Sequence, residues 1–255
     1  MSRTVLITGA TSGIGESCAY QFAKNQYNLI LTGRRLDRLE TLKAKLEGDY
    51  KIQVQILCFD VRSLDETKHA ISSIDFNLFP SIDILINNAG LAAGMSTIDE
   101  GDYDDWNQMI DTNVKGLLHV SREIIPYMKV KMQGHIVNIS STAAKDVYAK
   151  GNVYCATKHA VDALSKSMRI DLLPFGIKVT AINPGACETE FSLVRFKGDE
   201  ERAKSIYAGY QPLTPADVAD AVYYACTLPA HVCINDLTLT CLTQANAHYS
   251  IKKSV

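Results

Sequence analysis

Seven short apolar runs, separated by longer stretches of helical pattern, constrain the fold of this chain more than any other feature. The runs are rich in Val, Ile and Leu throughout, which is typical of strands covered on both faces. Alternation of strand and helix predicts an α/β fold with one doubly wound parallel sheet of about seven strands and helices on both faces. The predicted strands are residues 5–8, 28–32, 53–59, 82–86, 135–140, 178–182 and 237–241. The predicted helices cover about 14–25, 36–47, 64–76, 104–131, 153–173 and 215–228.

One domain, residues 1–255, is the simplest organisation, because no linker, repeat or low-complexity block interrupts the alternation. A hydrophobic fraction of 47% in 255 residues is enough for one sizeable core. The net charge of −2 gives no indication of nucleic-acid binding, and no long apolar run predicts a membrane span. A less regular segment at about 185–210 is typical of a substrate loop or lid.

Cysteine and histidine usage narrows the class of protein further. The 7 cysteines are an odd number without a Cys-x-x-Cys pair, which indicates reduced thiols. The first predicted strand begins too early for a signal peptide to precede it, so we expect a cytoplasmic protein. The 6 histidines show no His-x-x-x-His spacing, and we expect no metal site.

A glycine-rich turn follows the first predicted strand and opens the first predicted helix. Its residues Gly9, Thr11, Ser12, Gly13 and Ile14 follow a Gly-x-x-x-Gly-x-Gly spacing. Such a turn lets the backbone approach a pyrophosphate, which the free N–H groups and dipole of the helix N-terminus would bind. A turn without a ligand is the alternative, but its place at the start of a βαβ series favours a dinucleotide site.

Polar residues end the next three predicted strands, where ligands of open α/β sheets bind. Arg34 and Arg35 end the second strand, where an NAD site usually has Asp or Glu. A guanidinium pair suits a 2′-phosphate instead, so we predict NADP; a solvated arginine pair is the alternative. Asp60, Val61 and Asn87, at the ends of the third and fourth strands, are further candidates for cofactor contacts, although Asn and Gly after Asn87 also fit a plain turn.

The candidate chemistry lies in Tyr154 and Lys158, four residues apart and hence on one face of a predicted helix. A tyrosine has a pKa near 10 and is a poor base, but a neighbouring cation favours its phenolate. Tyr154 could then exchange a proton with an alcohol or carbonyl oxygen, which Ser141 would hold in place. Asn113 could continue a proton path through water beyond Lys158. A structural surface pair is the alternative for Tyr154 and Lys158 considered alone.

Taken together, these motifs resemble the short-chain dehydrogenase/reductase family over nearly the whole chain. The matching residues are Gly9, Gly13-Ile14-Gly15, Asn87-Asn88-Ala89-Gly90, Asn113, Ser141, Tyr154, Lys158 and Pro184-Gly185. The resemblance implies a Rossmann-like fold, B-face hydride transfer and a catalytic Asn–Ser–Tyr–Lys tetrad. It also implies that Tyr154 and Lys158 contact the cofactor, with Lys158 bonding the nicotinamide ribose. The segment from Pro184 and Gly185 to Thr189 and Ser192 would then pass beside the nicotinamide.

A narrower resemblance is to the NADP-dependent 3-hydroxy-acid dehydrogenases of bacteria and yeast. It rests on residues 32–36, 151–154, 189–199 and 228–232 and fades after residue 244. That group implies a homotetramer that acts on serine, L-allo-threonine and other 3-hydroxy acids and reduces malonic semialdehyde. The tail 245–255 therefore carries no functional inference from this resemblance beyond a subunit contact.

The substrate carboxylate of such an enzyme needs a cation. Arg195, in the loop after Gly185, is the first candidate, and Lys197, Lys145 and Lys150 are weaker ones. A solvent-facing or interface role for Arg195 is the equal alternative. Two other functions remain open at this stage: a broad carbonyl or ketosteroid-type reductase, and an NADPH-binding sensor without turnover. The presence of Ser141, Tyr154 and Lys158 together argues against the sensor.

Overall fold

A seven-stranded sheet runs through the computed structural model, which describes residues 3–251. The strands are β1 (Thr4–Ile7), β2 (Asn28–Gly33), β3 (Val54–Cys58), β4 (Ile84–Asn87), β5 (Gly134–Ile139), β6 (Ile177–Pro184) and β7 (Asp236–Leu239). Their order is β3-β2-β1-β4-β5-β6-β7, and every neighbouring pair is parallel. The predicted fold class is confirmed, and every strand begins and ends within two residues of its expected bounds. The chain ends, including the last four residues of the tail 245–255, lie outside the described residues.

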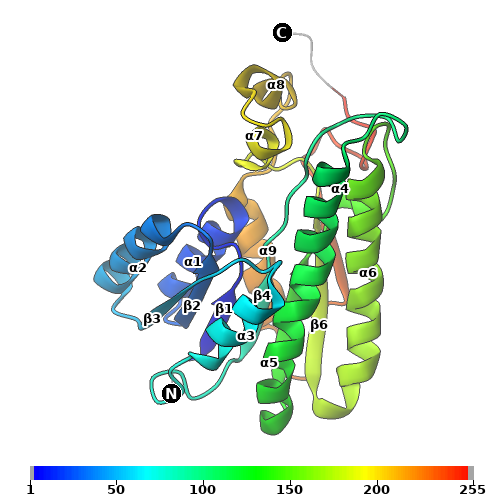
Figure 1. Ribbon diagram of the computed structural model, residues 1–255. Coiled ribbons are helices and arrows are strands. Elements are labelled where there is room, and N and C mark those ends of the chain that lie inside the picture. Colours follow the sequence, from blue (N-terminus) through cyan, green and yellow to red (C-terminus); the bar gives the residue numbers. More distant parts are fainter. Residues whose placement is uncertain (1–2, 252–255) are drawn as a thin grey trace.

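Helices cover both faces of this sheet (Figure 1). One layer consists of α1 (Gly13–Lys24), α2 (Leu36–Tyr50) and α9 (Pro215–Thr227). The opposite layer includes α3 (Leu64–Ser72), α5 (Leu117–Lys131) and α6 (Asn152–Leu172). Because the central strands β1, β4 and β5 are buried on both sides, the architecture explains their continuous apolar runs; the edge strand β7 is partly exposed. None of the described helices is long and apolar enough to cross a bilayer.

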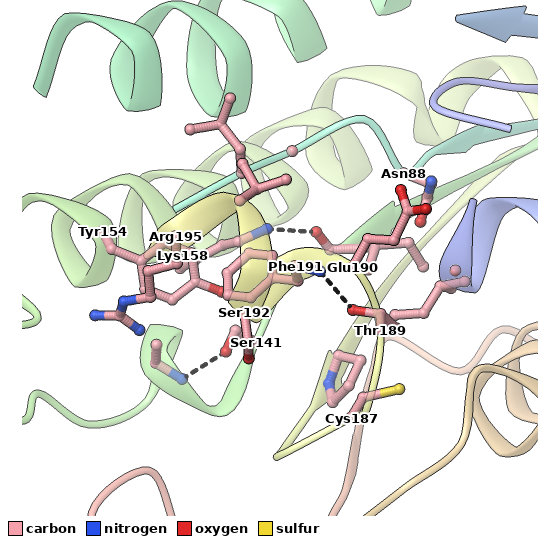
Figure 2. A pocket seen from close by; sticks show the side chains of 18 of the residues that line it. Asn88, Ser141, Tyr154, Lys158, Cys187, Thr189, Glu190, Phe191, Ser192 and Arg195 are labelled. Atoms are coloured by element: carbon pink, nitrogen blue, oxygen red, sulfur yellow. Dashed lines mark hydrogen bonds between the residues drawn. The ribbon is translucent and has the colours of Figure 1, made fainter. Parts of the chain in front are cut away.

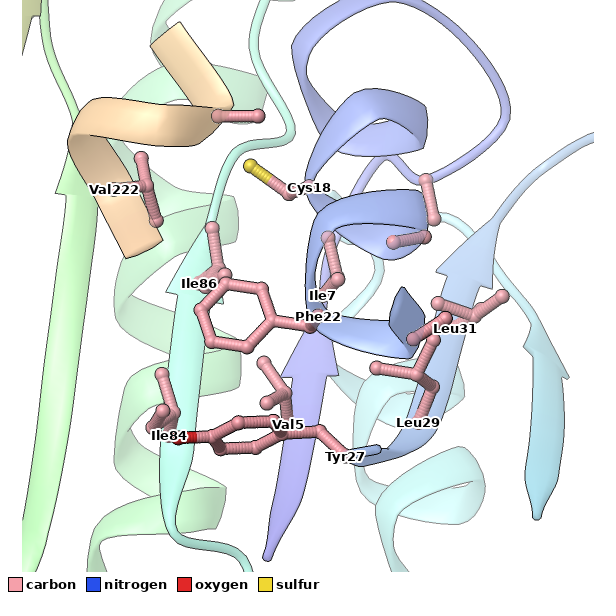
Figure 3. Close-up of a cluster of buried hydrophobic side chains, with 14 of the residues drawn as sticks. Val5, Ile7, Cys18, Phe22, Tyr27, Leu29, Leu31, Ile84, Ile86 and Val222 are labelled. Carbon is pink, nitrogen blue, oxygen red and sulfur yellow. The ribbon is translucent and has the colours of Figure 1, made fainter. Parts of the chain in front are cut away.

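Strand β1 shows how one sequence supplies two cores. Val5 and Ile7 pack with Phe22 of α1 in one cluster, whereas Leu6 between them belongs to the cluster under α3, α5 and α6. This is the period-2 alternation of a strand, with apolar residues in both phases. Figure 3 shows the first cluster, where the Phe22 ring lies edge-on to Tyr27 at a centroid distance of 5.1 Å.

Two segments differ from the simple helical expectation. The predicted helix 104–131 is divided into α4 (Tyr103–Ile110), a π-helical turn (Asp111–Gly116) and α5. The predicted irregular segment 185–210 contains two short helices, α7 (Phe191–Arg195) and α8 (Glu200–Ser205), and Asp199 caps the second by accepting from the Arg202 amide. Short 3-10 turns also occur at Thr142–Ala144 and Leu173–Phe175. In Figure 1, α7 and α8 stand above the carboxyl ends of the central strands.

Candidate active site

A cavity of about 620 Å³ follows the carboxyl edge of the sheet and joins the predicted nucleotide and chemical ends. Most of the site residues predicted from the sequence line it. They are Gly9, Thr11, Ser12, Gly13, Ile14, Arg34, Arg35, Asp60, Val61, Ser141, Tyr154, Lys158, Pro184, Gly185, Thr189, Ser192 and Arg195. Asn87 and Asn113 are not among the lining residues. Residues from widely separated segments are therefore brought to one elongated space, as a dinucleotide and a small substrate would need.

The glycine turn has the backbone geometry of an anion cradle. Gly9 and Gly13 have positive φ values of 67° and 58°, in the region that favours glycine. Ser12 is the N-cap of α1, but its side chain makes no capping hydrogen bond, so the first N–H groups of the helix are not used by it. The Asn88 side-chain amide donates to the Thr8 and Gly9 carbonyl oxygens and thereby holds the turn in place. These features fit a pyrophosphate at the start of α1.

The arginines after β2 contact the glycine turn and Glu190. Glu190 belongs to the segment 185–210, which was predicted as a substrate loop and is called the lid below. The Arg35 guanidinium donates to Thr11 Oγ1 and Ser12 Oγ, each at 2.9 Å, and pairs with Glu190 Oε2 at 3.0 Å. Arg34 is more exposed and lies 3.6 Å from Asp60 Oδ2. Arg38, in the first turn of α2, also donates to the Glu190 carboxylate at 2.8 Å. The sequence did not predict this contact, because helix spacing alone does not show that Arg38 would reach Glu190.

Two polar strand ends are committed to protein contacts. The Asp60 carboxylate accepts from the Arg62 guanidinium at 2.6 Å and 2.9 Å; burial would raise its pKa, but the Arg62 hydrogen bonds and charge bring that pKa below its usual range. Asn87 is buried, and its side chain donates to Ser121 Oγ and Asn138 Oδ1 at 2.9 Å. The Asn87 side chain therefore does not line the cavity, and its cofactor contact stays a prediction. Its neighbour Asn88 lines the cavity instead.

The chemical end is built by β5 and α6. Ser141 lies two residues after the end of β5, and Tyr154 and Lys158 leave α6 on the face that lines the cavity, as their spacing predicted (Figure 2). Both α6 side chains are buried, at 8% and 6% exposure. The Lys158 ammonium group donates to the Ile139 carbonyl oxygen at 3.0 Å and lies 5.9 Å from the centre of the Tyr154 ring.

Burial dominates the protonation of this pair. It raises the pKa of Tyr154, with a further increase from Tyr148, and hydrogen bonding to Ser141 and the Arg195 charge oppose that increase. Burial also lowers the pKa of Lys158 to about 8. The sequence indicated that Lys158 would favour the phenolate, but the protein groups alone hold Tyr154 as a phenol. Tyr154 is thus set up first as a proton donor, and only added positive charge beside it would favour the phenolate.

Asn113 lies in the π-helical turn, where its side chain hydrogen-bonds other protein groups and does not line the cavity. Its Oδ1 accepts from the Leu91 amide at 2.8 Å, and its Nδ2 donates to the Leu91 carbonyl at 2.8 Å and to Thr157 Oγ1 at 3.0 Å. Both amide hydrogens are therefore used. The side chain thus connects the loop after β4, at Leu91, to Thr157 of α6, the residue before Lys158. The predicted water path beyond Lys158 remains a prediction.

The lid brings a cation next to the phenol. Arg195, at the end of α7, has its guanidinium carbon 5.6 Å from the Tyr154 ring centre and donates to the Tyr148 hydroxyl at 2.9 Å. Phe191 meets the Tyr154 ring edge-on at a centroid distance of 5.6 Å. Ser192, predicted beside the cofactor, is buried and hydrogen-bonds the Tyr207 hydroxyl at 2.7 Å.

The weaker cationic candidates have other partners or lie apart. Lys197 pairs with Asp105 at 3.0 Å and thereby anchors the end of the lid to α4. Lys145 pairs with Asp162 and Asp236, both at 2.6 Å. Lys150 is exposed and does not line the large cavity. Arg195 is therefore the cation best placed for a substrate at Tyr154.

The tail contributes a wall that the sequence did not indicate. Residues 244 and 246–250 line the cavity, and Gln244 Oε1 accepts from the Ala186 amide at 2.8 Å. The Ala245 amide donates to the Tyr249 carbonyl, which closes a short loop. The tail, from which the sequence supported no functional inference beyond a subunit contact, thus forms part of the cavity wall. Within residues 3–251, no three His, Cys, Asp or Glu side chains are grouped as a metal ion would need.

Known proteins share this fold and these motifs. Residues 3–199 match the family model of the short chain dehydrogenases. The chain therefore belongs to the short-chain dehydrogenase family. Its relatives include the NADP-dependent 3-hydroxy acid dehydrogenase of Salmonella typhi, 44% identical over 98% of this chain and 99% of that enzyme. The serine 3-dehydrogenase of Agrobacterium fabrum is 41% identical over 98% of both chains.

Solved structures agree with the narrower resemblance. The closed form of a serine dehydrogenase complexed with NADP⁺ has a TM-score of 0.92 and 44% identity, covering 98% of this chain and 100% of that one. Serine dehydrogenase from Escherichia coli has a TM-score of 0.81 and 40% identity, covering 95% and 99% of the two chains. Both resemblances predicted from the sequence, to the family and to the 3-hydroxy-acid dehydrogenases, are confirmed.

Proposed function

We propose that this protein is an NADP-dependent oxidoreductase that interconverts short 3-hydroxy acids, including hydroxy amino acids, with their 3-oxo forms. The observation that carries the proposal is the Arg195 guanidinium 5.6 Å from the Tyr154 ring, in a cavity whose far end holds two arginines beside a glycine turn. A carboxylate on Arg195 would place a hydroxyl two carbons away near Tyr154. The relatives named above, at 44% and 41% identity, support the same substrate class.

The cofactor fits the residues present. The glycine turn and the N-terminus of α1 would hold the pyrophosphate, Arg34 and Arg35 the 2′-phosphate, and Lys158 the nicotinamide ribose. When bound, NADP accepts or supplies the hydride, and its oxidised nicotinamide adds positive charge near the phenol. Thr189 and Ser192 of the lid line the same cavity and would flank the nicotinamide.

The protein groups then have distinct roles. Tyr154 donates its proton to the carbonyl oxygen in reduction and removes the hydroxyl proton in oxidation. Ser141 hydrogen-bonds the reacting oxygen and orients it. Lys158, with its pKa lowered to about 8 by burial, supplies charge beside Tyr154 and gains charge stabilisation from any anionic neighbour. Asn113 would position Lys158 and α6 and continue the proton path.

A steady-state screen tests the substrate class. Serine, allo-threonine, 3-hydroxypropionate and 3-hydroxyisobutyrate are assayed with NADP⁺ and with NAD⁺, and malonic semialdehyde with NADPH in the reverse direction. We expect turnover of the 3-hydroxy acids, with a higher kcat/KM for NADP⁺ than for NAD⁺. Activity on bulky ketones but on none of these acids would favour a broad carbonyl or ketosteroid-type reductase. NADPH binding without turnover of any substrate would favour a sensor.

We also propose that the protein works as a single-domain subunit, residues 1–255, of a cytoplasmic homotetramer. The single sheet of the described residues supports the single domain, and the resemblance to the 3-hydroxy-acid dehydrogenases, which implies a homotetramer, supports the assembly. Light scattering coupled to gel filtration measures the mass directly: four times the 28.1 kDa of one chain is expected. A monomer or dimer at assay concentration would contradict the tetramer.

A further inference from the structure

A carboxylate of the lid uses two of the arginines at the nucleotide end. Glu190, the N-cap residue of α7, accepts from Arg35 Nη1 through Oε2 at 3.0 Å and from Arg38 Nη1 through Oε1 at 2.8 Å. Each carboxylate oxygen thus has its own guanidinium. The three side chains are 39% to 43% exposed, so the cluster lies at the rim of the cavity.

The place of this cluster is that of the cofactor 2′-phosphate. Arg35 is the N-cap of α2, two residues after the end of β2, a position beside the adenosine ribose in a fold of this kind, and both Arg35 and Glu190 line the cavity. The other donors of Arg35, Nε and Nη2, are directed to Thr11 and Ser12 in the glycine turn. Arg35 Nη1 donates to Glu190. The pKa of Glu190 is lowered, and the hydrogen bond from Arg38 is the largest cause. The donors that a phosphate would need therefore already bind an anion.

We infer that Glu190 is an internal competitor for the 2′-phosphate of NADP, occupying the anion subsite formed by Arg35 and Arg38 until the cofactor phosphate displaces it. This inference rests on the proposed use of NADP and adds a residue that sets its affinity. Arg38 becomes a third cation of the phosphate site, beside the two predicted arginines. Because Glu190 begins α7, the exchange also releases one tie between the lid and α2; Thr189 beside it still packs on Gly13, whose added Cβ would meet Thr189 at 3.2 Å.

A latch that holds the lid over bound cofactor is the opposite reading of the same contacts. Removal of a competitor strengthens binding of nucleotides with a 2′-phosphate, whereas removal of a latch weakens binding. The competitor is also selective, because a nucleotide without the 2′-phosphate does not need the two arginines. The sign and the selectivity of the change therefore separate the two.

Calorimetric titration of the whole chain with adenosine 2′,5′-bisphosphate and with 5′-AMP makes this comparison, since the two probes differ only in the 2′-phosphate. For Glu190→Gln we expect the bisphosphate to bind about 3- to 10-fold more tightly than to the wild type, the range given by losing one or two partly exposed ion pairs. 5′-AMP should bind equally to both. The gain should shrink as salt is added, because exposed charges are screened.

Glu188→Gln is the matched control: it removes the same charge two residues away, from an exposed carboxylate without an ion pair among the described residues, and should leave both affinities unchanged. Unchanged or weaker bisphosphate binding to Glu190→Gln, or an equal gain for 5′-AMP, would overturn the inference alone. A wild type that binds both probes equally would overturn the NADP assignment and, with it, this inference.

Discussion

The two ends of the cavity are built in different ways. At the nucleotide end, the groups that would hold the pyrophosphate come from one turn, Gly9 to Gly13, whose backbone N–H groups would make most of the contacts. At the substrate end, the cation beside Tyr154 is Arg195, which comes from the distant helix α7, and Gln244 and residues 246–250 close the same cavity. The nucleotide end therefore depends on local conformation, and the substrate end on tertiary packing of side chains.

This difference indicates which end of the cavity can change in sequence without affecting the other. A change of side chain at Arg195 or Tyr148 alters the shape and charge around Tyr154 without touching the turn that binds the cofactor. A change at the turn would act on every substrate alike. The lid connects the two ends, since Glu190 pairs with the arginines of the first and Arg195 lies over the second.

Tyr154→Phe would separate the two ends most sharply. Loss of a positioned proton donor is expected to lower kcat by about 10²- to 10⁴-fold, while the dissociation constant for NADPH changes little. Stopped-flow turnover and calorimetric NADPH titration measure the two effects. Tyr103→Phe, which removes the hydroxyl of an exposed tyrosine, should match the wild type in both. Retained turnover in Tyr154→Phe would remove this residue from the proton transfer.

Arg195→Ala should act on the substrate end alone. Loss of a charge-assisted contact to the carboxylate is expected to raise KM for a 3-hydroxy acid by about 10- to 100-fold, with little effect on KM for NADP⁺. Arg202→Ala is the matched control, because it removes a cation of the next lid helix that lies over Phe196 at 4.5 Å. If Arg195→Ala leaves KM for the acid unchanged, the carboxylate is held elsewhere.

The same contrast explains what the sequence could predict. The strands could be predicted because burial on both faces requires continuous apolar runs, as in β1. The glycine turn and the Tyr154–Lys158 pair could be predicted because their spacing encodes their geometry. Asn87 could not be told from Asn88 by composition. Which of the two faces the cavity depends on where β4 ends, and that is a matter of one residue.

The features that the sequence did not reveal depend on long-range contacts. The π-helical turn coincides with the bonds of Asn113 to Leu91 and Thr157, which no local propensity contains. Arg38 matters only because Glu190, 152 positions later, reaches it. Gln244 lies at the cavity because it binds the Ala186 amide. The short helix α8 had one local signal, Asp199 before two glutamates, which is typical of a helix start.

The smallest effect concerns β5, the strand that leads from His135 to Ser141 and so supports the substrate end. Burial, with smaller contributions from the Lys178 and Arg3 charges, lowers the pKa of His135 from 6.5 to about 3, and its Nε2 bonds Thr180 Oγ1 at 2.7 Å. The folded protein therefore keeps His135 neutral, whereas the unfolded chain takes up a proton below about pH 6.5. This contribution to stability is complete above that pH and is lost as pH falls toward 3.

Between pH 6.5 and 5.5 the free energy of unfolding should fall by about 1 kcal/mol through this one group. Urea denaturation at several pH values should show a smaller decrease over this range in His135→Gln than in the wild type, whatever the starting stability of the variant. His69→Gln, which removes an exposed histidine of α3, should leave the decrease as it is in the wild type. Equal decreases in wild type and His135→Gln would show that His135 is protonated in the folded protein. In that case, a loss of activity below pH 6.5 would be caused by groups around Tyr154 and not by destabilisation of β5.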